Sequence, residues 1–180
     1  ATISRNGDLV HRMYLEIEGT VAEKKNFNAT SITDVELEIG GQKIDKHTGQ
    51  WMNVWSHLTE PNPSGHVGEL CSDVQKGTLF QNMSGMGGVN GDTGGTQTNT
   101  KTFVPLMFWF CRNPGLALPL IALQYHEVKI ILNHNFASDS QYGAINTNKL
   151  WCDYIYLDTD ERRRFAQVSH EYLIEQVQES

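Results

Sequence analysis

The chain has 180 residues, which is enough for one domain with its own hydrophobic core. Hydrophobic residues make up 39% of the chain and charged residues 19%, so the composition excludes both a disordered protein and a membrane-embedded one. Lysine and arginine number 14 against 21 acidic residues, for a net charge of −7, which disfavours a general nucleic-acid binder because phosphate neutralisation requires basic side chains.

The ends of the chain and its cysteines indicate its context. No charged-then-apolar leader follows Ala1, so we expect no secretory signal. Both ends interrupt a patterned sequence, which suggests a fragment of a longer protein. The cysteines, Cys71, Cys111 and Cys152, stand far apart, which predicts reduced and mostly buried thiols rather than a disulfide scaffold or a zinc site.

The first third of the chain predicts antiparallel strands. Leu9–Glu18 alternates apolar and polar residues with period two, which is typical of a half-buried strand. Thr33–Asp45 repeats the alternation around Gly40-Gly41, and these glycines supply the backbone freedom that a tight hairpin turn needs. The polar positions include two carboxylate pairs, which we interpret as solvated faces that deter edge-to-edge association: Glu16 with Glu18, and Glu36 with Glu38.

One segment predicts an amphipathic helix. Its apolar residues recur with the spacing i, i+3, i+4 and i+7: Trp51, Val54, Trp55 and Leu58. Thr48 or Asp45 is placed to cap the start of this helix, and Pro61 ends it. We expect the aromatic stripe to pack on the core, with both tryptophans buried, rather than to bind a ligand.

The segment Thr59–Lys101 has a different composition, with nine of the 16 glycines. This predicts a long surface loop, which is usually functional or mobile, with a short element at Glu69–Phe80. The run Met83–Gly88 resembles a phosphate cradle, but no Gly-Lys-Ser/Thr follows it, so we do not expect nucleotide binding.

The second half of the chain predicts three more strands: Phe103–Phe110, His126–Asn133 and Leu150–Asp158. Leu116–Gln124 predicts either a short helix or an irregular core segment, and a single helical turn is expected after Asp160. In the last strand, Trp151, Ile155 and Leu157 share one face, opposite Tyr154 and Tyr156. The apolar window Phe103–Leu123 is long enough to span a bilayer, but its arginine, asparagine and prolines exclude a transmembrane segment.

These elements predict an all-β antiparallel sandwich or barrel, because strands dominate and no βαβ alternation occurs. About six strands are recognisable, whereas a jelly roll has about eight. The shortfall indicates a strand missed in the glycine-rich segment or one that precedes Ala1.

We predict no catalytic, cofactor-binding or metal-ligating residue. The sequence has no Gly-x-Ser-x-Gly, His-Glu-x-x-His or Walker motif. His126 and Glu127 are adjacent and point to opposite faces of a strand, and His134 lies about 26 Å farther along it. The remaining histidines have no ligand spacing: His11, His47, His57 and His66. Two matches to the glycosylation pattern, at Asn28 and Asn82, are attributed to chance.

Several segments in a fixed order resemble a known family. They are Ile3–Leu9, Asp34–His47, Pro114–Lys129, Asp153–Thr159 with the arginines after it, and His170–Gln176. Together they resemble the major capsid protein of nucleocytoplasmic large DNA viruses, of the phycodnavirus and iridovirus type. The resemblance covers nearly the whole chain outside the glycine-rich segment.

The resemblance implies a subunit of two consecutive jelly rolls, with three subunits in a pseudo-hexagonal capsomer of an icosahedral shell. By position, residues 1–165 correspond to the first jelly roll without its first strand, and residues 166–180 to a linker leading to an absent second jelly roll. The implied location is the virion, with assembly in the host cytoplasm. The implied partners are further copies of the chain in a homotrimer, neighbouring capsomers and candidate minor capsid proteins, without direct nucleic-acid contact; glycans are left open.

Two other function classes fit a β-sandwich. A carbohydrate-binding module would need Trp51, Trp55 or loop residues exposed for stacking on sugar. A jelly-roll metalloenzyme would need converging histidines and carboxylates, which the spacing does not provide. The family also implies that the segment 59–101 lies on the outer surface of the capsomer.

Overall fold

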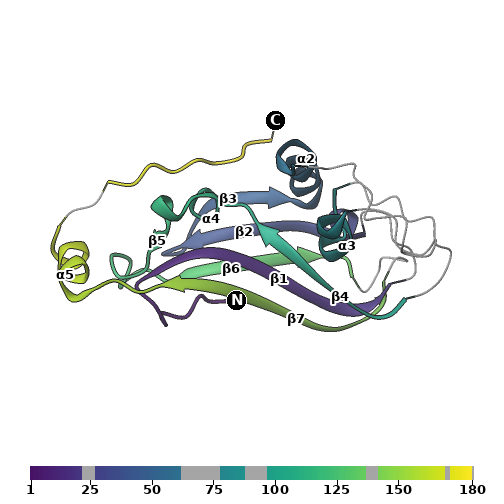
Figure 1. Ribbon diagram of the computed structural model, residues 1–180, viewed down its shortest axis with the longest axis horizontal. Coiled ribbons are helices and arrows are strands. Elements are labelled where there is room, and N and C mark those ends of the chain that lie inside the picture. The colour runs from purple at the N-terminus through teal and green to yellow at the C-terminus, as the bar shows by residue number, and fades with distance from the viewer. Residues whose placement is uncertain (22–26, 62–77, 88–96, 137–141, 169–170, 180) are drawn as a thin grey trace.

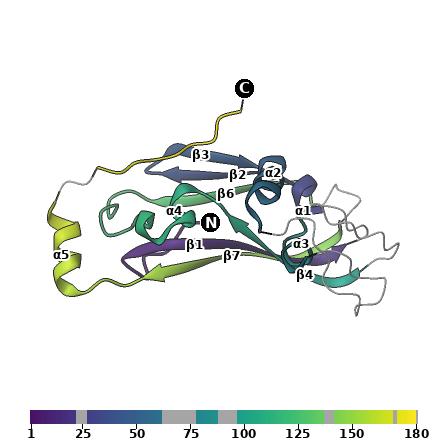
Figure 2. The ribbon, with the colours of Figure 1, turned by 45° about the horizontal axis from the view of Figure 1, so that its top comes forward.

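A computed structural model of the chain describes residues 1–21, 27–61, 78–87, 97–136, 142–168 and 171–179. Within these residues, two antiparallel sheets form the layers of a sandwich, with short helices at its ends and along one side (Figures 1 and 2). This architecture confirms the predicted all-β class. No helix among the described residues is long and apolar enough to cross a bilayer.

The four-stranded sheet is built around β1 (Leu9–Val21), whose alternating pattern confirms the first predicted strand. It pairs with β4 (Gln97–Leu106) along one side and with β7 (Tyr142–Ile155) along the other. The short β5 (Leu118–Pro119) pairs with the start of β1. Pairing places Leu15 of β1 opposite apolar residues of β4 and β7, so one face of this sheet is continuous and apolar.

The three-stranded sheet has the order β3-β2-β6. β2 (Ile32–Ile39) and β3 (Gln42–Thr48) form the predicted hairpin, and Gly40 and Gly41 between them have positive φ values of 60° and 83°. β6 (Val128–His134) confirms another predicted strand. The first residues of the chain line the free side of β6, because Ala1 and Ile130 exchange backbone hydrogen bonds.

The core lies between the two sheets. β1 contributes Met13, Leu15 and Ile17, and the three-stranded sheet contributes Val35 and Leu37. A cluster of aromatic side chains with 1% exposure or less completes it: Phe108, Trp109, Phe110 and Phe136. Each buried side chain of this size contributes about 2–3 kcal/mol through the area it removes from water.

Two helices, α1 (Phe27–Ser31) and α2 (Gly49–Thr59), pack against each other at one end of the sandwich. Thr48 caps α2 by accepting a hydrogen bond from the backbone N–H of Trp51 at 3.1 Å, which confirms one of the two predicted caps. The helix ends before Pro61, as expected.

The buried face of α2 differs from the prediction. Its buried residues are Gly49, Met52 and Ser56, whereas Val54 and Leu58 are 42% and 73% exposed. A Cβ atom at Gly49 would lie 2.3 Å from the carbonyl oxygen of Ile32, so the helix approaches neighbouring backbone through small residues. The predicted aromatic stripe therefore points outward, and both tryptophans are only half-buried.

The apolar run Phe103–Phe110 was predicted as one strand, and this is wrong beyond Leu106. β4 ends there, and Trp109 and Phe110 belong to α4 (Trp109–Arg112), which is followed by the 3-10 turn η1 (Pro114–Leu116). Periodicity cannot separate a buried strand from a buried helical turn in a run without polar residues. The helix turns both aromatic side chains into the core.

The last strand and the helix after it are longer than predicted. β7 begins at Tyr142 rather than near Leu150, and α5 (Thr159–Gln167) exceeds the single predicted turn. Of the two faces of β7, the one that carries Trp151 points outward, since Trp151 is 53% exposed, whereas Cys152 and Tyr154 pack against the core. Asp158 caps α5 with its carboxylate.

The glycine-rich segment is described only in part. α3 (Leu79–Ser84) begins inside the expected Glu69–Phe80 element, whose residues 69–77 lie outside the described residues. β4 begins at Gln97, so the end of this segment is a strand rather than a loop. Leu116–Gln124 is mostly turn around β5, which agrees with the irregular alternative.

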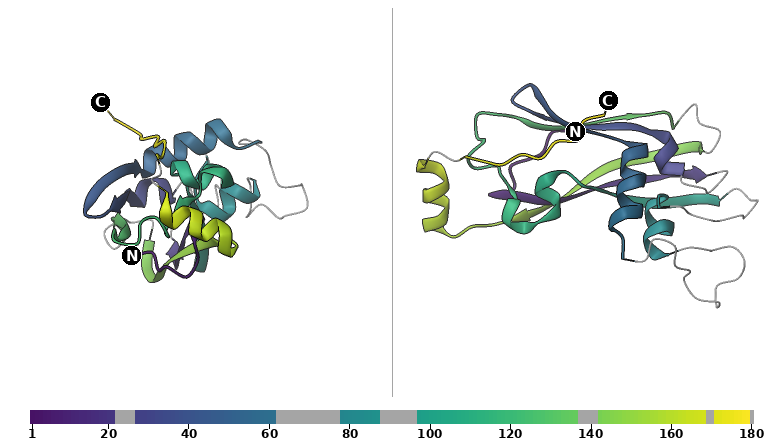
Figure 3. Two further views of the ribbon diagram at one scale, coloured as in Figure 1. Left: turned by 90° about the vertical axis from the view of Figure 1, so that its left-hand side faces the viewer. Right: turned by 90° about the horizontal axis from the view of Figure 1, so that it is seen from above.

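Residues 171–179, here called the C-terminal strap, have no regular structure and run in extended form past β3 and α4 (Figures 1 and 3). The strap leads from the end of the molecule that carries α5 back toward α2. It lies on the side of the molecule that carries the three-stranded sheet.

Candidate functional site

The histidines that the sequence analysis tested as metal ligands lie apart from one another in the described part of the chain. His57 and His126 are exposed, and His11 Nδ1 lies 2.8 Å from the carbonyl oxygen of Phe110. His134 stacks on Phe136, with 4.3 Å between the ring centroids, and His66 is outside the described residues. Among the residues that the structure describes, no group of three His, Cys, Asp or Glu side chains could hold a metal ion.

One titratable pair is fully enclosed. His47 Nε2 lies 3.0 Å from Asp45 Oδ2, and the side chains are 2% and 0% exposed. Both residues are on β3 and point to the same face, because positions i and i+2 of a strand do so. The His47 ring also stacks on Phe108 at 4.6 Å. Alternation over Asp45 and His47 was the sequence signal for this pair, and it was not recognised.

The carboxylate of Asp45 is the point where β3 holds the C-terminal strap. Asp45 Oδ1 accepts hydrogen bonds from the backbone N–H of Val177 at 3.0 Å and of Lys46 at 2.9 Å. Burial raises the pKa of Asp45, but His47 and these two N–H groups favour the charged form and hold the pKa below its usual range. Asp45 is therefore an ionised anchor for the strap.

Further contacts fix the strap on both sides of this anchor. The hydroxyl of Tyr172 donates to the carbonyl oxygen of Ala117 at 2.8 Å and also contacts that of Leu116. Three more side-chain contacts follow along the strap: Arg112 with Glu175 at 2.8 Å, Gln176 with the carbonyl of Ile44, and Thr48 with Glu179 at 2.7 Å. The strap is an ordered part of the surface.

The interpretation of both carboxylate pairs as solvated is wrong for one member of each. Glu16 is 3% exposed and Glu36 is 8% exposed. Glu16 accepts a hydrogen bond of 2.5 Å from the indole N–H of Trp151, and Lys101 lies 3.2 Å away. The indole N–H first, and then the lysines, lower the pKa of Glu16 against the opposing effect of burial. Lys43 covers Glu36 at 2.8 Å.

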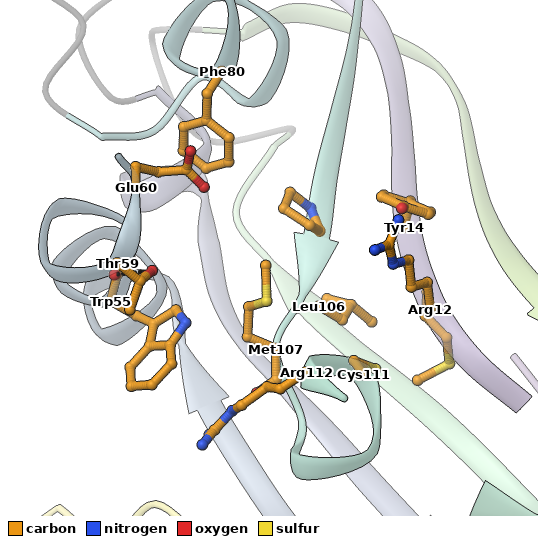
Figure 4. A pocket seen from close by; sticks show the side chains of 12 residues that line it. Arg12, Tyr14, Trp55, Thr59, Glu60, Phe80, Leu106, Met107, Cys111 and Arg112 are labelled. Carbon is orange, nitrogen blue, oxygen red and sulfur yellow. Dashed lines mark hydrogen bonds between the residues drawn. The ribbon is translucent and has the colours of Figure 1, made fainter. Parts of the chain in front are cut away.

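The two tryptophans of α2 line separate cavities, and their rings are 5.8 Å apart. Trp51 lines a cavity of about 520 Å³ that the strap residue Glu179 also reaches. Trp55 lines a cavity of about 420 Å³, here called the α2–β1 groove. The residues lining this groove are Arg12, Met13, Tyr14, Trp55, Thr59, Glu60, Phe80, Pro105, Leu106, Met107, Cys111 and Arg112 (Figure 4).

The remaining candidate groups are enclosed by the fold. Burial raises the pKa of Cys111 to about 12 and that of Cys152 to about 11, so both remain thiols at neutral pH. Cys71 lies outside the described residues. Asn28 is fully buried and donates to Ser84 and Thr102, so this acceptor motif is inaccessible in the folded chain.

Comparison with known proteins gives a consistent result over the length of the chain. Residues 1–158 match the family model described as the major capsid protein N-terminus. The chain is 49% identical to the major capsid protein of Pyramimonas orientalis virus, an alignment that covers 98% of this chain and 44% of that protein. It is 41% identical to the major capsid protein of Paramecium bursaria Chlorella virus 1, with 98% and 40% covered.

The structural comparison agrees. A chain of the quasi-atomic model of the PBCV-1 virus capsid superposes with a TM-score of 0.72 at 40% sequence identity, covering 98% of this chain and 42% of that chain. The sandwich is thus a jelly roll of the kind found in that protein. The chain spans less than half the length of these relatives. It belongs to the major capsid protein family of large DNA viruses and corresponds to the N-terminal part of those proteins.

Proposed function

We propose that this chain is part of a structural protein that forms the shell of a large icosahedral DNA virus. The observation that carries the proposal is the match over 98% of the chain to major capsid proteins, together with the superposition on a chain of the PBCV-1 capsid. The well-packed core of the sandwich is consistent with this structural role. A shell subunit needs a rigid core and surfaces that repeat in every copy, and it needs no reaction centre.

The proposal extends to organisation and assembly. Residues 1–165 are the first of two jelly rolls, and residues 166–180 lead toward the second. Three copies of the whole protein associate as a homotrimer with pseudo-hexagonal outline, and these capsomers contact one another and minor capsid proteins in the virion. Heterologous contacts that close on rotation give such a trimer. Assembly takes place in the host cytoplasm.

The proposed role includes no catalysis, cofactor, metal or direct nucleic-acid contact. The buried titratable side chains of both sheets are engaged within the chain. Asp45 and His47 anchor the strap, and Glu16 and Glu36 are covered by tryptophan or lysine. Their contacts provide structural roles for these residues.

Expression of the full reading frame that contains this chain tests the proposal. We expect purified protein to sediment as a trimer and to appear in electron micrographs as particles of hexagonal outline. A species that remains monomeric over the whole accessible concentration range would contradict the shell function.

A carbohydrate-binding module is the second candidate, because Trp51 and Trp55 are half-exposed beside cavities rather than buried. The Arg112 guanidinium lies 4.5 Å from the ring centroid of Trp55 and covers one face of that indole, which weakens this candidate. Isothermal titration with a panel of oligosaccharides decides the question. Heat of binding that disappears in Trp51→Ala would support the module, and its absence would leave the shell role alone.

A further inference from the structure

The cavity of about 520 Å³ at Trp51 lies where the C-terminal strap ends, and it is here called the α2–strap cavity. Trp51 and Val54 contribute apolar surface from α2, Ile32 contributes apolar surface from β2, and Glu179 of the strap is also part of the lining. Val54 is 42% exposed and Trp51 is half-buried, so this apolar surface is open to an occupant.

The lining of the cavity is mixed in character. Thr33 of β2 and Gln50 of α2 add polar groups beside the apolar surface. An extended peptide presents backbone N–H and C=O groups between its side chains, and these groups need hydrogen-bond partners when they leave water. A cavity that offers polar and apolar groups together therefore suits an extended segment of polypeptide.

The end of the strap is fixed beside this cavity. The hydroxyl of Thr48 donates a hydrogen bond of 2.7 Å to the carboxylate of Glu179. Thr48 is the N-cap of α2, so this carboxylate lies at the positive end of a helix of 11 residues, which favours a negative charge. The last described residue of the strap is thus held where α2 begins (Figure 1).

The direction of the strap is fixed as well. Its contacts advance together along the strap and along β3 into the cap of α2: Gln176 with Ile44, Val177 with Asp45, and Glu179 with Thr48. The strap therefore runs parallel to β3, and the chain leaves Glu179 in the direction in which β3 continues into α2. Four further residues in extended form span about 13 Å, which carries the chain into the cavity that Glu179 already lines.

The relatives of this chain are more than twice as long, since the alignment with the Pyramimonas orientalis virus protein covers 44% of that protein. We propose that the residues directly following Ser180 in the whole protein occupy the α2–strap cavity, with an apolar side chain against Trp51 and Val54. A segment tethered this closely has an effective concentration in roughly the millimolar range, which favours it over a second copy or a free ligand.

The inference rests on the proposed function, in which this chain precedes a second jelly roll. The contact fixes where the second half of the protein begins relative to this sandwich. It also gives the bond between Thr48 and Glu179 a role, because this bond aims the chain into the cavity.

A photo-crosslink in the full-length protein tests the occupant. Val54→p-benzoyl-phenylalanine places a photoreactive group in the cavity, and peptide mapping by mass spectrometry identifies its target. We expect a link to about the first five residues after Ser180, at monomer mass in a denaturing gel because the link lies within one chain. Tyr125→p-benzoyl-phenylalanine, at a position that is 88% exposed and outside the cavity lining, is the control and should not reach that segment.

Three results of the crosslinking experiment would overturn the proposal. One is a link from position 54 to another segment of the same chain. Another is a product of dimer mass, which would identify a second copy as the occupant. The third is a yield no higher than that of the control at position 125.

Hydrogen exchange in the same full-length protein measures how firmly the cavity holds the segment. The backbone amides just after Ser180 should exchange about tenfold faster in Val54→Lys and in Trp51→Ala than in the wild type. Leu58→Lys is the matched control, because Leu58 is on the same helix, is 73% exposed and does not line the cavity. Unchanged exchange in both cavity variants, with an unchanged melting temperature, would contradict the contact.

The outcomes separate this inference from the shell function. If the full-length protein forms trimers and position 54 links to a different segment or a second chain, the cavity contact is wrong and the shell function stands. If the wild type stays monomeric while position 54 links to the residues after Ser180, the cavity contact stands and the shell function fails.

Discussion

The sandwich interior and the C-terminal strap are held by different forces. The interior consists of apolar side chains such as Phe108 and Phe110, both 0% exposed, between the two sheets. The strap is held by a few polar contacts, chiefly to Asp45 and Arg112, and it turns Leu173 to the solvent. Apolar burial is nearly independent of pH and salt, whereas hydrogen bonds to ionised groups are not.

This difference indicates which part of the chain can lose a contact without global unfolding of the sandwich. Loss of an interior side chain weakens the whole sandwich, because the core belongs to one cooperative unit. Loss of a strap contact releases residues 171–179 first, since local opening costs less than global unfolding. The strap is therefore the part of the described chain that can open while the jelly roll stays intact.

The largest effect is expected in the interior. Phe110→Ala removes a ring that stacks edge-on against Trp109 at 5.1 Å, and it should lower the free energy of unfolding by about 4 kcal/mol. Urea denaturation monitored by circular dichroism measures the loss. Tyr125→Ala is the control, because this side chain is 88% exposed and its removal should change stability by less than about 0.5 kcal/mol. If both variants lost the same free energy of unfolding, the buried aromatic cluster would contribute no more to stability than an exposed side chain does.

The next effect is expected at the strap anchor. Asp45→Ala leaves His47 enclosed without its partner and Val177 without its acceptor, and it should cost about 3 kcal/mol. Limited proteolysis should then cut within residues 171–179 while the sandwich resists. Asp45→Asn keeps an oxygen for Val177 and should protect the strap better than Asp45→Ala. Equal strap protection in wild type and Asp45→Ala would contradict the anchor.

Acid should release the strap before it unfolds the core. The pKa of Asp45 is lower in the folded chain than its ordinary value of 3.8, so Asp45 contributes stability that is fully present above this value. That contribution is lost as the pH falls through the folded pKa. Hydrogen exchange of the strap amides should accordingly accelerate only below about pH 4. Asp45→Asn should lack this acid step, and a step that persists in it would assign the effect to another group.

Period-two patterns made the sheets predictable. β1, the β2–β3 hairpin and β6 follow from alternation, because one face of each strand lies on the core. The pattern does not reveal what covers the other face. Glu16 occupies an outward position and is nevertheless 3% exposed, since Trp151 and Lys101 come from strands far away in the sequence.

The orientation of α2 and the contacts of the strap were much less predictable. The stripe of Trp51, Val54, Trp55 and Leu58 has the period of a buried helix face, and the prediction that it packs on the core failed. The close approach at Gly49 decides which side of α2 faces inward, and this depends on backbone of Ile32 and Ala29 that the helix pattern does not contain. The strap contacts join residues more than 50 positions apart, so no local pattern encodes them.

The smallest effect is expected at the hydroxyl of Tyr172, where the strap meets the aromatic cluster. Burial raises the pKa of Tyr172 to about 12, so the hydroxyl stays protonated and donates to Ala117 at any ordinary pH. Tyr172→Phe keeps the ring against Trp109 and should cost about 1 kcal/mol, measured by urea denaturation. Tyr156→Phe is the matched control, because Tyr156 is 67% exposed. If the two variants lose equal stability, the hydroxyl is not a strap contact, and Tyr172 holds the strap by ring packing alone.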